Sequence, residues 1–119
     1  MTRPAAWIDI TATDAARSRA FYGELFGWPV HVVEKIDYGL VEPGPERLPA
    51  GIGQAGEGNR HPVGMVTYFT VDDVPAALSR ALDLGATTAV EPWEVPGMGT
   101  MAVVLDPDGT RVGLWTPPA

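Results

Sequence analysis

Hydrophobic and polar residues alternate along several short segments of the chain, and this period of two predicts β-strands. In residues 5–11, two isoleucines fall on one face, while Trp7, Asp9 and Thr11 fall on the other. Similar apolar segments predict seven more strands, at residues 28–34, 37–42, 50–54, 66–71, 87–91, 100–105 and 111–116. The polar side chains on these strand faces are the first candidates for a functional site.

Two other segments have the apolar spacing of helices. The first is expected to begin at the cap Thr13-Asp14, whose side-chain oxygens can accept free amides of the first turn, and to end at Gly27. The second begins at Asp72-Asp73, tolerates Pro75 in its first turn, and ends at Gly85. Two pairs in the first helix lie four residues apart and are expected to face the sheet: Phe21 with Leu25, and Tyr22 with Phe26.

The order strand–helix–three strands therefore occurs twice. The distance from Asp14 to Gly27 is 13 residues, as is the distance from Asp72 to Gly85. This repeat predicts an α+β fold with a first module at about residues 5–56, a linker at about 57–63 and a second module at about 64–117. Each module alone is too small to bury its sheet face, so residues 1–119 are expected to form a single domain.

The segment Asp106-Pro107-Asp108-Gly109 joins the last two predicted strands. Proline suits the second position of a tight turn, and Gly109 supplies the residue with positive φ that follows. A calcium loop would need Asp or Asn and then glycine where Thr110 and Arg111 stand, and a closing glutamate. The two aspartates are therefore assigned to a hairpin turn.

Composition narrows the classes of function. The chain has 119 residues, a net charge of −7 and no cysteine. The acidic charge argues against nucleic acid and anionic membrane surfaces as partners, and disulfides and thiolate chemistry are excluded. We find neither a signal peptide nor an apolar run long enough to span a bilayer, so a cytoplasmic location is expected.

Three segments resemble signatures of the vicinal oxygen chelate superfamily, which includes glyoxalases and bleomycin resistance proteins. Asp14 with residues 21–28 (Phe-Tyr-Gly-Glu-Leu-Phe-Gly-Trp) is similar to its first-helix signature. Residues 72–74 and 84–86 are similar to the second, and residues 105–109 with 113–115 to the last hairpin. The resemblance implies paired βαβββ modules whose mixed sheets curl into a cup. It also implies a homodimer with a small-molecule ligand.

In metal-using members of this superfamily, four strand residues, usually His, Glu or Asp, hold a cation that polarises vicinal oxygens of the substrate. Carried over by position, the four residues here are Trp7, Gln54, Val66 and Gly113. None is an ordinary ligand for a catalytic cation, apart from the weak amide oxygen of Gln54. No metal or other cofactor is therefore expected.

An aromatic cup is expected in place of the metal site. Strand parity places six residues on its wall, and residues 92–99 are expected to form a loop that closes over its mouth. The expected ligand-binding residues are Trp7, Asp9, Gln54, Val66, Tyr68, Trp93, Met98, Gly113 and Trp115. In this interpretation Gly113 leaves space for the ligand, and the tryptophans stack on it.

The favoured function is metal-free binding of a hydrophobic or aromatic small molecule, as in drug or metabolite sequestration. A cationic ligand would suit the acidic chain, with Asp9 as its counter-ion. The alternative is a metal-independent isomerase, cyclase or hydrolase of a polyketide-like substrate. In that enzyme Asp9, with Tyr68 or His31, would do acid–base work. A metal-dependent glyoxalase or dioxygenase is disfavoured by the four substituted positions.

Overall fold

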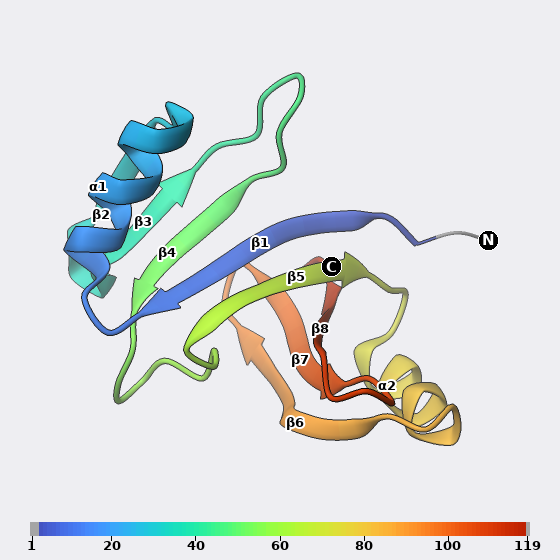
Figure 1. Cartoon of the computed structure of the whole chain (residues 1–119). Helices are drawn as coiled ribbons and strands as arrows, with labels where there is room; N and C mark the ends of the chain where they lie inside the picture. Colours follow the sequence, from blue (N-terminus) through green and yellow to red (C-terminus); the bar gives the residue numbers. More distant parts are fainter. Residues whose placement is uncertain (1–2, 119) are drawn as a thin grey trace. The chain divides into compact units, whose positions relative to one another are not determined.

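The computed structural model describes residues 3–118, and its elements follow the order βαβββ twice (Figure 1). The first series consists of β1 (Ala5–Ala12), α1 (Ala15–Phe26), β2 (Val30–Val33), the 3-10 helix η1 (Glu34–Ile36), β3 (Tyr38–Val41) and β4 (Ala50–Gln54). The second consists of β5 (Gly64–Thr70), α2 (Val74–Asp83), β6 (Thr87–Val95), β7 (Gly99–Leu105) and β8 (Arg111–Thr116). The α+β class and the internal repeat are confirmed.

The chain contains two compact units. One is Trp7–Val66, and the other combines residues 3–6 with residues 67–118. In the first unit the strand order is β2-β3-β4-β1, with β1 and β4 parallel. In the second the order is β5-β8-β7-β6, with β5 and β8 parallel. The other pairs in each unit are antiparallel, so both units have a mixed sheet of the same topology.

Helix α1 begins and ends where the sequence predicts. The Asp14 side chain accepts a hydrogen bond from the Arg17 amide at 3.1 Å, and Gly27 adopts the left-handed conformation at φ 69°. Glycine reaches this conformation without steric cost, which explains why the helix ends there. Within its unit, α1 lies alongside the sheet formed by the early strands (Figure 1).

The expectation that the aromatic pairs of α1 face the sheet is wrong. Phe21, Leu25 and Phe26 are 55%, 58% and 57% exposed. The buried face of α1 instead contains Ala15 and, one turn later, Arg19, whose stem crosses Gly39 of β3. Phe21 is two residues after Arg19 and therefore points away from the sheet. The neighbouring rings still stack: Tyr22 lies 6.1 Å from Phe26 and 5.4 Å from Trp28, centroid to centroid.

Helix α2 begins one residue later than the equal spacing suggests. Its N-cap is Asp73, whose side chain accepts from the Ala76 amide at 3.0 Å, and a proline occupies the first turn. Asp72 instead forms a two-pronged ion pair with Arg3, at 2.8 and 3.0 Å. The two helices are 12 and 10 residues long, so the matched 13-residue spacing does not reflect matched caps. Within residues 3–118, neither helix is long and apolar enough to cross a membrane.

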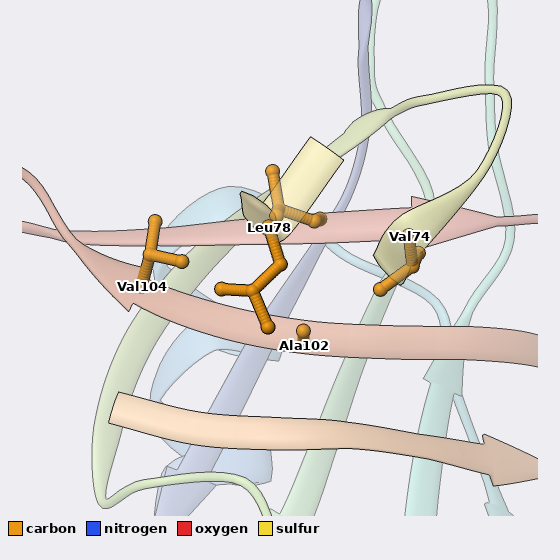
Figure 2. Packing of buried hydrophobic residues seen from close by; sticks show 5 residues of the cluster. Val74, Leu78, Ala102 and Val104 are labelled. Carbon is orange, nitrogen blue, oxygen red and sulfur yellow. The ribbon is translucent and has the colours of Figure 1, made fainter. Parts of the chain in front are cut away.

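One face of α2 packs on its own sheet. Leu78 and Val74 point from the helix toward Ala102 and Val104 of β7 (Figure 2). Leu114 of β8 completes this cluster, and Val112 packs against it. The two β8 residues are two positions apart, so strand alternation places them on the same face. The burial of these aliphatic side chains removes apolar surface from water, which is the main stabilising contribution to such a core.

Of two predicted connections between strands, one is confirmed by the structure and one is partly wrong. The hairpin turn is confirmed: Oδ1 of Asp106 accepts from the amides of Asp108 and Thr110, and Gly109 has φ 87°. The predicted loop at 92–99 is wrong in its first half, because β6 continues to Val95. Pro92 is tolerated in this strand because β6 is the last strand of its sheet and contains irregular pairing before Trp93.

Candidate functional site

A buried polar cluster lies within the Trp7–Val66 unit and is centred on Asp9 of β1. The Asp9 side chain is 0% exposed. Its Oδ2 accepts from the Thr11 hydroxyl at 2.7 Å, and its Oδ1 accepts from the Tyr38 hydroxyl at 3.3 Å. Nδ1 of His61 lies 3.5 Å from Oδ2. We call Asp9, Thr11, Tyr38 and His61 the Asp9 cluster.

Strand alternation explains why Thr11 belongs to the cluster. Residues two apart on a strand point to the same side, so Thr11 and Trp7 flank Asp9 on one face of β1. The bond between the Thr11 hydroxyl and the Asp9 carboxyl confirms the predicted shared face. Trp7 is also buried, so an indole and the Asp9 carboxyl are both buried on this face of β1.

Tyr38 reaches Asp9 because two glycines make room for its ring. Tyr38 is on β3 and Asp9 is on β1, with β4 between them. A Cβ on Gly51 of β4 would overlap the Tyr38 hydroxyl, and one on Gly53 would lie 3.0 Å from the Tyr38 ring. The absence of both side chains lets the phenol lie across β4. The Gly51-Ile-Gly53 pattern was the available sequence signal for this contact, and sequence reasoning missed it.

His61 reaches the cluster from the segment between β4 and β5, residues 55–63. Asn59 holds this segment, because its amide donates to the Gln54 carbonyl and its side-chain oxygen accepts from the His61 amide, both at 2.9 Å. The imidazole lies edge-on to the Trp7 ring, with centroids 5.8 Å apart and planes at 88°. Its side chain is 12% exposed. No local pattern marks His61, because the sequence predicts only a linker at about residues 57–63.

Burial shifts the proton affinities of both ionisable partners. Burial of Asp9 raises its pKa to about 7, against the lowering effect of the hydrogen bonds from Thr11 and Tyr38. Burial of His61 lowers its pKa to about 4. At neutral pH the imidazole is therefore neutral, while Asp9 is divided between its acid and its carboxylate. Such a group can accept or release a proton near pH 7.

The partners expected for Asp9 in acid–base work are not the ones found beside it in this unit. His31 is exposed on β2, which is separated from β1 by β3 and β4. Tyr68 belongs to the other compact unit and is completely buried there. The hydroxyl and imidazole next to Asp9 come instead from Tyr38 and His61.

Gln54 has a structural role at the start of α1. Its Oε1 accepts from the Ala15 amide at 3.0 Å, and its Nε2 donates to the Thr13 carbonyl at 2.8 Å. These bonds satisfy backbone groups at the helix start, where helices leave amides without internal partners. The amide oxygen expected to be a weak metal ligand is therefore already bound.

In the second unit, Tyr68 and Gly113 are paired across β5 and β8. A Cβ on Gly113 would overlap the Tyr68 ring. The space beside this glycine, which we expected a ligand to use, is filled by Tyr68 of the same chain. Tyr68 is 0% exposed, so the ring is a packed part of this unit.

The remaining expected binding residues have different structural environments. Trp115 donates from its indole nitrogen to the Met98 carbonyl at 2.6 Å, which fixes the turn after β6 against the end of β8. Trp93 is part of β6 and pairs with Met101, so it is on a strand and not in a loop. Met98 is exposed in the turn, and Val66 is buried at the end of the Trp7–Val66 unit.

The four positions that hold a cation in metal-using relatives do not fit a metal here. Trp7, Val66 and Gly113 offer no ligand atom, and the Gln54 amide caps α1. Within residues 3–118 no group of three or more His, Asp or Glu side chains is placed to hold an ion. These four residues therefore do not form a cation site.

Comparison with known proteins places the chain in a family. The family model for the Glyoxalase/Bleomycin resistance protein/Dioxygenase superfamily matches residues 5–114. The anthracycline biosynthesis protein DnrV of Streptomyces peucetius is 32% identical, over 92% of this chain and 46% of its own length. The chain thus spans about half the length of the curated relatives that it matches.

Solved structures agree on the fold. Methylmalonyl-CoA epimerase from Mycobacterium tuberculosis has a TM-score of 0.66 at 13% identity, covering 97% of this chain and 88% of that chain. A glyoxalase/bleomycin resistance protein/dioxygenase superfamily member from Vibrio splendidus 12B01 has a TM-score of 0.63 at 14% identity, covering 97% and 99%. The chain belongs to the Glyoxalase/Bleomycin resistance protein/Dioxygenase superfamily.

Proposed function

We propose that this protein binds a small hydrophobic or aromatic molecule and holds it without a metal or other cofactor. The observation that supports this is the wholly buried Asp9 carboxyl, bonded to Thr11 and Tyr38 and placed beside Trp7. Burial of an ionisable group is costly to the fold and is common at functional sites. In this proposal Asp9 is the polar anchor, and Trp7 is the aromatic wall that gives contact area.

The charge of the chain favours a basic ligand. A net charge of −7 raises the local concentration of cations around the protein. The relative named for anthracycline biosynthesis is compatible with an aromatic ligand, since anthracyclines are polycyclic aromatic compounds. We include in the proposal that the protein is a homodimer and that it acts in the cytoplasm.

The test is retention of small molecules. The protein is incubated with a small-molecule extract and with a panel of aromatic amines, and mass spectrometry identifies the compounds held and recovered. We expect a compound that returns unchanged and binds more weakly to Asp9→Asn and Trp7→Leu variants. Asp83→Asn, an exposed carboxylate at the end of α2, is the matched control for the lost charge. Retention that is equal in all four proteins would reject the proposal.

A second function rests on a separate observation, the pKa of about 7 at Asp9. A base with this pKa is suited to proton transfer at neutral pH, and the Tyr38 hydroxyl, which donates to Asp9, stabilises the carboxylate form of this base. The reaction would be a metal-independent isomerisation, cyclisation or hydrolysis. A compound returned with altered mass or retention time, only in the presence of protein, would support it. Asp9→Asn would then lower turnover by about 10²–10⁴-fold.

A further inference from the structure

We propose that the His61 imidazole occupies the position of the ligand in the Asp9 cluster, and that the ligand is a planar nitrogen base with an N–H donor. The inference rests on the proposed binding function and names the ligand class for that site. It also assigns residues 55–63 as the cover that must move for the ligand to reach Asp9.

Something must move because Asp9 is inaccessible. Its side chain is 0% exposed, and Thr11, Tyr38 and His61 surround the carboxyl oxygens. Two surface cavities, of about 470 and 380 Å³, are lined by other residues and do not include the Asp9 cluster. A ligand can reach this carboxyl only if a residue that covers it moves, and the three polar partners are the candidates.

His61 is the partner that can be displaced without breaking the sheet. Thr11 is on β1 itself, and Tyr38 is on β3, with its ring packed over Gly51 and Gly53. His61 is in a segment with neither helix nor strand. The contact of its imidazole with Asp9 is also the longest of the three, at 3.5 Å.

The backbone around His61 suits a hinged segment. Gly56, Gly58 and Gly64 have φ values of 138°, 88° and 116° and surround the segment on both sides. Glycine adopts these conformations at little steric cost, and it can also change to other backbone conformations easily. The side chain of Asn59 anchors residues 55–63 through its hydrogen bonds to the Gln54 carbonyl and the His61 amide.

The contacts of His61 define what can replace it. The imidazole presents a ring nitrogen to Asp9 and packs nearly perpendicular to the Trp7 ring. The imidazole nitrogen lies 3.5 Å from an Asp9 carboxyl oxygen, so a replacement that carries an N–H at this place can donate to a buried acceptor. It must also be flat, so that it packs nearly perpendicular to the indole as the imidazole does. Heteroaromatic bases and arylamines have both features, whereas carboxylic acids would be repelled by Asp9.

The test uses imidazole as the probe. Imidazole is titrated into the wild-type protein and into His61→Gly, His31→Gly and His61→Gly/Asp9→Asn variants, with tryptophan fluorescence and calorimetry as readouts. We expect saturable binding to His61→Gly at least about tenfold tighter than to wild type, as for one hydrogen bond to a buried acceptor. His31→Gly is the matched control, because His31 is the other histidine and is exposed. The double variant should bind no tighter than wild type.

Two results would overturn the inference. One is a folded His61→Gly variant that binds imidazole no better than wild type. The other is a double variant that binds as well as the single variant, since Asp9 would then have no part in recognition. Circular dichroism establishes that each variant is folded.

A second variant keeps the test decisive if His61→Gly does not fold. Asn59→Ala removes the anchor of the segment and leaves His61 in place. Because an opened segment exposes Asp9 more often, Asn59→Ala should bind benzimidazole about three- to tenfold more tightly than wild type. An unchanged or lower affinity would reject the role of residues 55–63 as a cover.

Failure of this inference is distinguishable from failure of the proposed function. If the wild-type protein retains a compound through Asp9 but His61→Gly and Asn59→Ala leave its affinity unchanged, the function holds and the inference fails. If His61→Gly binds imidazole through Asp9 but the wild-type protein retains no compound, the inference holds for the geometry and the function fails.

Discussion

The hydroxyl of Tyr38 on β3 donates to the carboxyl of Asp9 on β1 across the whole width of β4, at 3.3 Å. The contact depends on a strand between them that lacks side chains at two positions. Gly51 and Gly53 are therefore as important to the Asp9 cluster as the residues whose functional groups form it.

Gly51→Ala should disrupt this contact. The new methyl group would overlap the Tyr38 hydroxyl, so the ring must leave its place over β4. We expect a loss of roughly 1–3 kcal/mol in the free energy of unfolding, typical of overpacking in a core, measured by urea denaturation. Gly23→Ala in α1 is the matched control, because its Cβ would meet the nearest atom at an ordinary 3.5 Å. Gly23→Ala should be neutral or stabilising by about 0.5–1 kcal/mol, and equal losses in both variants would contradict the proposed steric cause.

Asp9→Asn should change the pH dependence of stability. Burial raises the Asp9 pKa in the folded state from 3.8 to about 7, so the folded protein holds this proton more tightly than the unfolded chain. Its contribution to stability is fully present below pH 4 and is lost as the pH rises to about 7. Relative to wild type, Asp9→Asn should therefore gain stability between pH 4 and 8, by up to about 4 kcal/mol. If the free energy of unfolding has the same pH dependence in both proteins, the pKa of Asp9 is not shifted in the folded state.

His61→Gln should show the opposite trend. Burial lowers the His61 pKa from 6.5 to about 4, so the unfolded chain binds this proton more readily than the folded protein. The contribution of the neutral imidazole is present above pH 6.5 and is lost as the pH falls toward 4. Relative to wild type, His61→Gln should gain stability on acidification over this range, by up to about 3 kcal/mol. His31→Gln, which alters an exposed histidine, serves as the control for the substitution type.

Asp73→Ala and Asp72→Ala should differ although the residues are adjacent. Asp73 caps α2 through the Ala76 amide, and loss of such a cap costs about 1 kcal/mol. Asp72 forms an ion pair with Arg3 at an exposed position, and such pairs contribute about 0–1 kcal/mol. Thermal unfolding should therefore show the larger decrease in Tm for Asp73→Ala. A larger decrease in Tm for Asp72→Ala would place the cap at Asp72, which is the position that the equal 13-residue spacing suggests.

The parts of the fold that depend on neighbouring residues could be predicted from the sequence. Asp14 and Gly27 begin and end α1, and Asp106 and Gly109 form the last turn, because each acts on backbone within a few residues of itself. Leu114 could be placed against a helix for a similar reason, since strand alternation determines its face. The exposure of Phe21 could not, because the sequence does not reveal that Arg19 takes the sheet-facing place.

The site was predictable only in part for the same physical reason. Trp7, Asp9 and Thr11 share a face by strand alternation, and this was expected. Tyr38 and His61 join them through strand order and through a segment without regular structure, neither of which has a local pattern. The space beside Gly113 was read as open, although Tyr68 of the paired strand fills it.

The parallel pairing of β1 with β4 has a consequence for how the chain folds. Its register joins Ile8 to Ala50, and α1, β2 and β3 lie between these partners in the sequence. Contacts of such long sequence separation close a large loop and slow the search for the native state. Tyr38 cannot lie over Gly51 until β3 and β4 have paired, and it cannot meet Asp9 until β4 has found β1. The Asp9 cluster is therefore expected to appear late in folding, so a nascent or partly unfolded chain lacks the site altogether.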